Sequence, residues 1–262
     1  MLKLAIQTNV WSDEDHRQNL PGIVAAIAAA GYAGLEIGAH RLDLDHPQDF
    51  LALLHQHGLQ VAGIHTHGQL YDPQAMTEAY PRIRRAVAYA AAVQSPFVLI
   101  SGGPKPGKTP ADQAHEAQTL NQVGQWCTES GLSLCYHNHY WEIEHNQAEL
   151  HALCEHTDPR LVSLALDIGW VHRAGGAPAA VASTFLDRIR YFHFKDFRIK
   201  DFQHDTWAEV GTGYVDFQGV LEVIRGRDYW LTVERDEALA EAAESARTSY
   251  QNLHQMLINL GL

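Results

Sequence analysis

The chain has 262 residues, 46% of them hydrophobic, and a formal net charge of -12 at pH 7 with the histidines neutral. This length suits a single domain over residues 1–262, with a core large enough for an α/β barrel. The acidic balance argues against a surface that attracts nucleic acid or anionic lipid. No apolar run approaches membrane-spanning length.

The spacing of the cysteines and the pattern of the N-terminal residues together predict the cellular compartment of the protein. Three cysteines stand without CxxC spacing, at Cys127, Cys135 and Cys154. This odd count argues for a reducing environment and against both a disulfide framework and a cysteine zinc knuckle. Residues 1–7 already form a strand pattern and carry no signal-peptide features. We therefore expect a cytoplasmic protein.

Short apolar runs of β character alternate with helical segments along the chain. The strands are predicted at residues 2–8, 34–38, 61–67, 97–101, 132–139, 162–167, 190–196 and 229–234. The helices are predicted at residues 20–30, 47–57, 76–93, 111–130, 148–156, 177–186, 217–225 and 238–260. Glycines mark the ends of several helices, as at Gly31, Gly58 and Gly131.

This strict alternation predicts a parallel sheet covered by helices, and eight repeats close it into a (β/α)8 TIM barrel. A doubly wound open sheet is the alternative. It is less favoured because no GxGxxG motif follows the first strand and the repeats keep a regular spacing to the end.

Polar residues gather at the C-terminal ends of the predicted strands. His137 and His139 lie two residues apart on one strand, so their side chains should share a face. The residues at such strand ends are Glu36, His65, His67, His137, His139, Asp167, His193, Lys195 and Glu234. In a barrel these ends all face one mouth, where the active sites of this fold lie.

Imidazoles and carboxylates without cysteine suit one divalent cation, such as Mn²⁺, Zn²⁺, Co²⁺, Fe²⁺ or Mg²⁺. A cation would also offset the cost of placing Asp167 and Glu234 together in one mouth. The alternative is a rim of hydrogen-bonded polar side chains that holds no metal.

Five motifs follow one another along the second half of the chain. They are Tyr136-His137-Asn138-His139, Leu166-Asp167-Ile168-Gly169, His193-Phe194-Lys195-Asp196, Gly211-Thr212-Gly213 and Val233-Glu234. The chain thereby resembles the sugar phosphate isomerase/epimerase group of the xylose-isomerase-like barrel superfamily. That superfamily includes inosose dehydratases, hydroxypyruvate isomerases and ketose 3-epimerases. The resemblance runs the full chain and implies an enzyme that acts on a small sugar, keto-sugar or inositol derivative.

The resemblance also implies the metal ligands. In that group a Glu, an Asp, a His and a Glu on the last four strands hold one ion, and by motif three of these become Asp167, His193 and Glu234. The fifth strand departs from the pattern, because His137 stands where many members have Glu. A site of two histidines and two carboxylates favours Mn²⁺, Zn²⁺ or Co²⁺, with Mg²⁺ still admitted. The change also removes half of the carboxylate pair that the epimerases use.

The mechanism that the resemblance implies is proton removal next to a carbonyl, with the metal as Lewis acid. Reprotonation then gives an isomerase or epimerase, and loss of a β-hydroxyl gives a dehydratase. Without a second carboxylate opposite Glu234, a symmetric 3-epimerase is disfavoured. The candidate catalytic residues are Glu234, His139, His65 and Lys195, since histidines titrate near working pH and Glu234 resembles the ligand and base of the epimerases.

The candidate substrate-binding residues are Glu36, His67, Trp170, His172 and Arg198. A salt bridge to Asp196 or Glu234 is the structural alternative for Lys195, and packing between helices is the alternative for Trp170. Arg198 lies in a long predicted loop at residues 197–213. Loops in this position bind phosphate in many barrels, but interleaved acidic residues favour a solvated loop.

Two other functions compete with the enzyme. A metal-dependent phosphodiesterase, like the apurinic-site endonucleases of the same superfamily, needs more metal ligands and a basic surface. A non-catalytic sugar-binding barrel needs no metal. We expect a small sugar-like substrate, no nucleic-acid or membrane partner and, because members of the superfamily commonly self-associate, a homodimer.

Overall fold

The computed structural model describes residues 1–201 and 204–262, with side chains described outside residues 199–205. Eight parallel strands form a closed barrel in the order β1-β10-β7-β6-β5-β4-β3-β2. Their bounds are β1 Lys3–Gln7, β2 Gly34–Gly38, β3 Gln60–Gly68, β4 Phe97–Gly102, β5 Ser133–His137, β6 Val162–Asp167, β7 Ile189–Phe194 and β10 Trp230–Val233. The predicted (β/α)8 barrel is confirmed.

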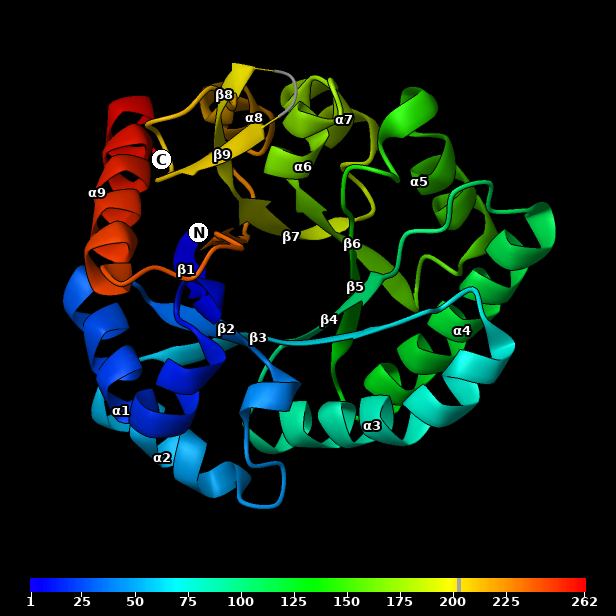
Figure 1. Ribbon diagram of the computed structural model, residues 1–262, viewed down its shortest axis with the longest axis horizontal. Helices are drawn as coiled ribbons and strands as arrows, with labels where there is room; N and C mark the ends of the chain where they lie inside the picture. The colour runs from blue at the N-terminus through cyan, green and yellow to red at the C-terminus, as the bar shows by residue number, and fades with distance from the viewer. Residues whose placement is uncertain (202–203) are drawn as a thin grey trace.

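The helices surround the central strands as an outer ring (Figure 1). Their bounds are α1 Asp13–Ala30, α2 Pro47–Gln56, α3 Pro73–Ala92, α4 Pro110–Glu129, α5 Glu144–His156, α6 Ile168–Arg173, α7 Pro178–Thr184, α8 Phe217–Val223 and α9 Ala242–Leu260, with 3-10 turns at Thr8–Val10 and Ala39–Arg41. The last helix, α9, packs against α1, so both ends of the chain meet where the barrel closes. Among the described residues, every helix falls short of the length and apolarity that a bilayer crossing requires.

Helix α1 begins earlier than the predicted start at residue 20. Ser12 accepts a hydrogen bond from the backbone of Asp15, whose side chain bonds back to Ser12, and this capping box starts the helix. The prediction was too short because Asn19, with φ of -150°, and Pro21 interrupt the helical pattern just inside it.

The segment predicted as a loop at residues 197–213 contains an antiparallel hairpin, which corrects that prediction. The hairpin joins β8 (Asp196–Asp201) to β9 (His204–Ala208). The rings of Phe197 and Trp207 pack 4.8 Å apart across it. Polar residues interleave with these aromatic ones, so the sequence shows no sustained apolar alternation there.

Buried apolar side chains form two clusters, one on each side of the barrel wall. Apolar side chains fill the space between strands and helices, and a smaller cluster fills the barrel interior. The interior cluster comprises Ala5, Ala62, Leu99, Cys135, Ala165, Tyr191 and Trp230. Parallel strands turn all C-terminal ends to one side, and the register places Asp167 beside His193 and Ser101 beside His137. The strand-end residues therefore share one mouth.

Candidate metal centre

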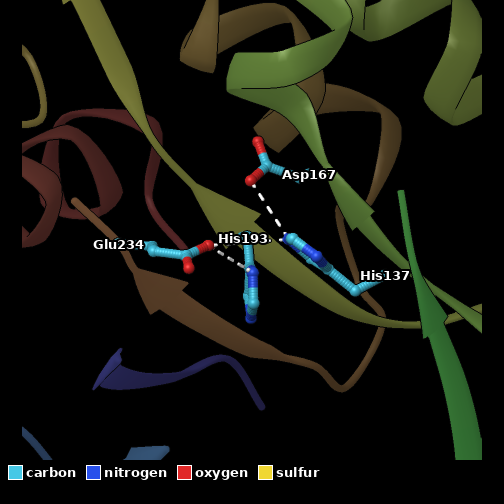
Figure 2. A group of neighbouring side chains, drawn as sticks. All are labelled: His137, Asp167, His193 and Glu234. Carbon is cyan, nitrogen blue, oxygen red and sulfur yellow. Dashed lines mark hydrogen bonds and ion pairs between the residues drawn. The ribbon is translucent and has the colours of Figure 1, made fainter. Parts of the chain in front are cut away.

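Four predicted ligands meet in the mouth of the barrel (Figure 2). His137 ends β5, Asp167 ends β6, His193 lies near the end of β7 and Glu234 directly follows β10. One ligand atom from each residue lies within 4.8 Å of the others. Each side chain is at most 2% exposed. The structure thus brings together all four residues that the sequence proposed for one ion.

The carboxylate of Glu36 contacts the ring of His193 at Nε2, while Nδ1 of the same ring faces Glu234. Oε2 of Glu36 lies 2.7 Å from Nε2 of His193, and Oε1 of Glu36 lies 2.9 Å from Nδ1 of His65. Burial opposes ionisation, but His193 and His65 lower the pKa of Glu36 to about 2. Because a carboxylate only accepts hydrogen bonds, Nε2 of His193 and Nδ1 of His65 carry the protons. This leaves Nδ1 of a neutral His193 free of hydrogen.

A chain of hydrogen bonds from His65 through Ser101 fixes the tautomer of His137 in the same way. Nε2 of His65 lies 2.8 Å from Oγ of Ser101, which lies 3.1 Å from Nδ1 of His137. Since His65 carries its proton on Nδ1, its Nε2 accepts from the Ser101 hydroxyl, which in turn accepts from Nδ1 of His137. Nε2 of His137 then presents a lone pair 3.3 Å from Oδ2 of Asp167 and 3.5 Å from Oε2 of Glu234.

Two atoms at the centre lack a hydrogen-bond partner. Nδ1 of His193 and Oε2 of Glu234 are buried and lie 2.7 Å apart, and neither has hydrogen-bond geometry with any of the described residues, although the Lys195 ammonium lies 3.2 Å from the same oxygen. Two lone pairs at this distance repel unless a proton or a cation lies between them. Nitrogen and oxygen acceptors converging in this way match the donor set of a divalent metal ion. The residues therefore fit the ion that the sequence motifs imply.

The charges lead to the same conclusion. Two buried carboxylates, Asp167 and Glu234, and the partly exposed Asp236 contact the buried Lys195. Its Nζ lies 3.1 Å from Oδ2 of Asp167, 3.2 Å from Oε2 of Glu234 and 2.7 Å from Oδ2 of Asp236. Burial opposes its charge, but Asp167, Asp236 and Glu234 raise the pKa of Lys195 above its ordinary value. One ammonium balances one of the negative charges of Asp167, Glu234 and Asp236, and a divalent cation would balance the other two.

Lys195 is held in place from two sides. Its ammonium lies 4.6 Å from the ring centre of Trp170 and 5.5 Å from that of Trp207. A Cβ on Gly169 would lie 2.4 Å from the carbonyl oxygen of Lys195, so only glycine lets α6 approach β7 this closely. Asp196 and Glu234 were the two salt-bridge partners expected for Lys195, and in the structure Lys195 pairs with Glu234.

Asp196, the other expected partner, serves the loop after the hairpin instead. Its Oδ2 accepts hydrogen bonds from the backbone of Gly211 at 2.9 Å and of Gly213 at 2.8 Å. A Cβ on Gly213 would lie 2.3 Å from Oδ1 of Asp196. The glycine motif is thus a backbone cradle for a carboxylate.

His139 lies on the aromatic side of the mouth. Its ring stacks on Trp141 at 4.4 Å and lies 5.7 Å from the ring of Trp170. Burial, with smaller effects from His137 and Lys195, lowers the pKa of His139 to about 2. The imidazole is therefore neutral, and its buried Nδ1 has no hydrogen-bond partner among the described residues.

Three predicted residues lie outside this cluster. His67 is exposed at the end of β3, His172 is half-buried on α6, and Arg198 is exposed, with its Nε donating to the backbone oxygen of Thr212. Among the described residues, no hydrogen bond or ion pair joins them to the four ligands.

Sequence reasoning missed three residues that hold the ligands. Asn9 donates to Oε1 of Glu234 at 3.1 Å, Asn138 accepts from the backbone of Asp167 at 2.9 Å, and Ser101 completes the chain between two histidines. Each follows or ends a strand, so the signal was the same strand-end position that identified the charged residues.

The chain matches known proteins over most of its length. The family described as xylose isomerase-like TIM barrel matches residues 24–254. The inosose dehydratase of Salmonella typhimurium is 25% identical, over 98% of this chain and 97% of that protein.

Two solved structures share the fold. A sugar phosphate isomerase/epimerase from Parabacteroides distasonis has a TM-score of 0.76 at 20% identity, over 96% of this chain and 93% of that one. A probable 3-DHS dehydratase from Bacillus anthracis has a TM-score of 0.80 at 12% identity, over 96% and 98%. With the family match covering most of the chain, the barrel and its mouth identify the protein as a member of the xylose isomerase-like TIM barrel family.

Proposed function

We propose that the protein is a metal-dependent dehydratase that acts on a small hydroxy-ketone of the sugar or inositol type. The observation that carries the proposal is the convergence of four ligand atoms in the mouth of the barrel, two of which make no hydrogen bond with the residues that the structure describes. The full-length similarity to an inosose dehydratase supports the reaction class.

The metal site would consist of His137, Asp167, His193 and Glu234. Two imidazoles and two carboxylates favour Zn²⁺, Mn²⁺ or Co²⁺ over Mg²⁺. Such an ion, when bound, supplies Lewis-acid polarisation of the substrate oxygens next to the reacting carbon. Glu36 and Ser101 position the two imidazoles, so we assign Glu36 to ligand orientation rather than to substrate binding.

Two side chains suit the proton transfers. Burial opposes ionisation, but Lys195 and His193 hold the pKa of Glu234 well below its ordinary value, so its carboxylate is ionised. We assign the α-proton to Glu234 because of its position among the four ligands, since a low pKa by itself makes a carboxylate a weak base. The Lys195 ammonium can donate a hydrogen bond to the departing β-hydroxyl, and the proton follows as the C–O bond breaks and its oxygen becomes strongly basic. The C–H and C–O bonds break, a C=C bond forms and water leaves.

This asymmetry favours elimination over epimerisation. An epimerase of the two-carboxylate kind needs a base on each face of the substrate, and His137 stands at the position of one of them. Its two ring nitrogens are committed to Ser101 and to the ligand cluster. His139 is neutral, and its unpartnered Nδ1 suits a hydrogen bond from a substrate hydroxyl rather than proton removal.

The aromatic side of the mouth suits a ring-shaped substrate. Trp170, Trp141 and Trp207 lie around His139 and Lys195. Their faces can pack against the apolar C–H face of a sugar or inositol ring while its hydroxyls turn to the polar centre.

The phosphodiesterase alternative has less support. Among residues 1–201 and 204–262, the group of four ligands is the one group of three or more that could hold an ion, whereas that chemistry called for additional ligands. The net charge of -12 also opposes DNA binding.

Elemental analysis and product analysis together test the proposal. We expect about one divalent ion per chain and, in D₂O, NMR signals of a dehydrated product from a keto-inositol. Asp167→Asn should abolish both the bound metal and the turnover. Full turnover by verified metal-free protein would refute the mechanism, and formation of an epimer without loss of water would refute the dehydratase assignment.

A further inference from the structure

We propose that His40, His67 and Arg82 form a second subsite in the mouth, which binds a carboxylate or phosphate group carried by the substrate. The inference rests on the proposed function, which concerns the reacting end of the substrate. It states in addition that the other end of the substrate carries a negative charge.

The subsite is a cavity next to the metal centre. It has a volume of about 340 Å³ and lies between the connection from β2 to α2, the end of β3 and helix α3. His65 lines one side of it, and the ring of His65 lies 5.4 Å from that of His137. One imidazole thus separates the cavity from the four ligands.

Arg82 supplies a positive charge without a carboxylate partner. Its Nη1 donates to Oγ1 of Thr66 at 3.1 Å and its Nη2 to the backbone oxygen of His67 at 2.7 Å, so the guanidinium is fixed at the end of β3. No carboxylate of the described residues lies within ion-pair distance of it. Arg85 lines the same cavity but is paired with Asp45 at 2.7 Å. A guanidinium has five N–H donors, and the two contacts above use two of those of Arg82. The others can bind a carboxylate or a phosphate.

Two imidazoles complete the subsite. The rings of His40 and His67 lie 6.4 Å apart. Gly38 makes room for His40, because a Cβ there would lie 2.5 Å from the His40 ring. Burial, followed by the charge of Arg82, lowers the pKa of His67, and burial, followed by Arg41, lowers that of His40.

The carboxylates around the cavity each pair with a residue other than Arg82. Asp13 lies 3.9 Å from His40 but bonds Arg41, and Asp43 bonds His46. Asp45 is paired with Arg85. Of the charged side chains that line the cavity, Asp43, Asp45 and Arg85 are thus paired, and among the described residues Arg82 is the lining charge without an opposite partner, which an anion would supply.

The position suits one end of a substrate. In the strand order, β2 and β3 stand opposite β6 and β7, which carry the aromatic side of the mouth. A ring packed against Trp170 can therefore reach across the ligands toward Arg82 with a charged substituent.

Titration of the purified full-length protein with inorganic phosphate tests the subsite, followed by the ring-proton NMR signals of the histidines. We expect saturable shifts of His40 and His67. Arg82→Gln should weaken phosphate binding about tenfold, the value of one charge-assisted hydrogen bond. Arg85→Gln is the matched control, because it removes a neighbouring but already paired arginine, and it should bind phosphate within about twofold of the wild type. The proposal is overturned if no saturable shift occurs, or if both variants bind like the wild type.

Competition experiments separate the sources of the anion. A neutral ketose, its phosphate ester and its sugar acid are each titrated against bound phosphate. Stronger competition by one charged form, lost in Arg82→Gln, supports a substrate subsite and identifies its anion; equal competition by all three refutes it. Metal content and turnover of the same samples decide the proposed function separately, since phosphate binding by a metal-free protein would uphold the subsite, and only full turnover by that protein would refute the metal enzyme.

Discussion

Oε2 of Glu36, in the middle of β2 rather than at its end, lies 2.7 Å from Nε2 of His193 on β7. The carboxylate selects the tautomer of an imidazole of the candidate metal centre, at the ring nitrogen that faces away from Glu234. Neither residue is exposed to solvent.

Glu36→Gln should therefore weaken metal binding about 10- to 100-fold. The amide no longer enforces a proton on Nε2 of His193. Competition with a chelator of known affinity measures the effect. Glu129→Gln on α4, an exposed position, is the control and should bind metal like the wild type. Unchanged affinity in Glu36→Gln would contradict the assigned tautomer.

Metal binding should release a proton. Burial opposes a charge on His193, but Glu36 and Glu234 raise its pKa well above the ordinary value when no cation is present. The proton then occupies the ligand nitrogen, so metal affinity should fall as pH falls and rise as pH increases toward this raised pKa. Calorimetry in two buffers of different ionisation heat should count about one proton released near neutral pH. A metal affinity that does not change between about pH 6 and about pH 8 would argue against this competition.

Lys195→Met should destabilise the metal-free protein more than the metal-loaded one. The substitution leaves Asp167 and Glu234 buried without their ammonium, which costs about 3–5 kcal/mol. A bound divalent ion restores positive charge at the same carboxylates. Urea unfolding with and without the metal measures the difference. Lys105→Met removes a half-exposed partner of Asp112 and should cost at most about 1 kcal/mol in both states. Equal losses for Lys195→Met in both states would show that the ammonium and the metal act independently.

Glu142 should make the protein less stable as pH rises. Burial raises its pKa from 4.5 to about 7, although Tyr136 and the backbone of His139 donate hydrogen bonds to it. The folded protein thus keeps a proton that the unfolded chain loses. This stability is fully present below pH 4.5 and is lost as pH rises through about 7.

The full loss is about 3 kcal/mol, from the size of the pKa shift. Glu142→Gln cannot ionise, so its unfolding free energy should stay flatter over this range in urea titrations at several pH values. Glu144→Gln, at an exposed position of the same segment, should keep the wild-type profile. A parallel profile for Glu142→Gln would exclude Glu142 as the cause.

The sequence by itself determined the barrel and the four residues that meet in the candidate metal centre. Alternating strand and helix patterns are local, and parallel strands must turn their C-terminal ends to one side. For this reason His137, Asp167, His193 and Glu234 could be placed in one mouth before any contact was known. Local patterns did not reveal the hairpin of β8 and β9, where aromatic pairing rather than apolar alternation joins the strands.

Only the tertiary structure decided what each polar residue does. Glu36 and His193 are 157 positions apart, and Asn9 and Glu234 are 225 apart, so no local pattern pairs them. Residue type and strand position look the same for a ligand and for the carboxylate that orients it, and nothing in the pattern of helix α3 distinguishes Arg82 from its other arginines. Their roles differ because hydrogen bonding and charge act over a few ångströms, and only the closed barrel sets which atoms come that close.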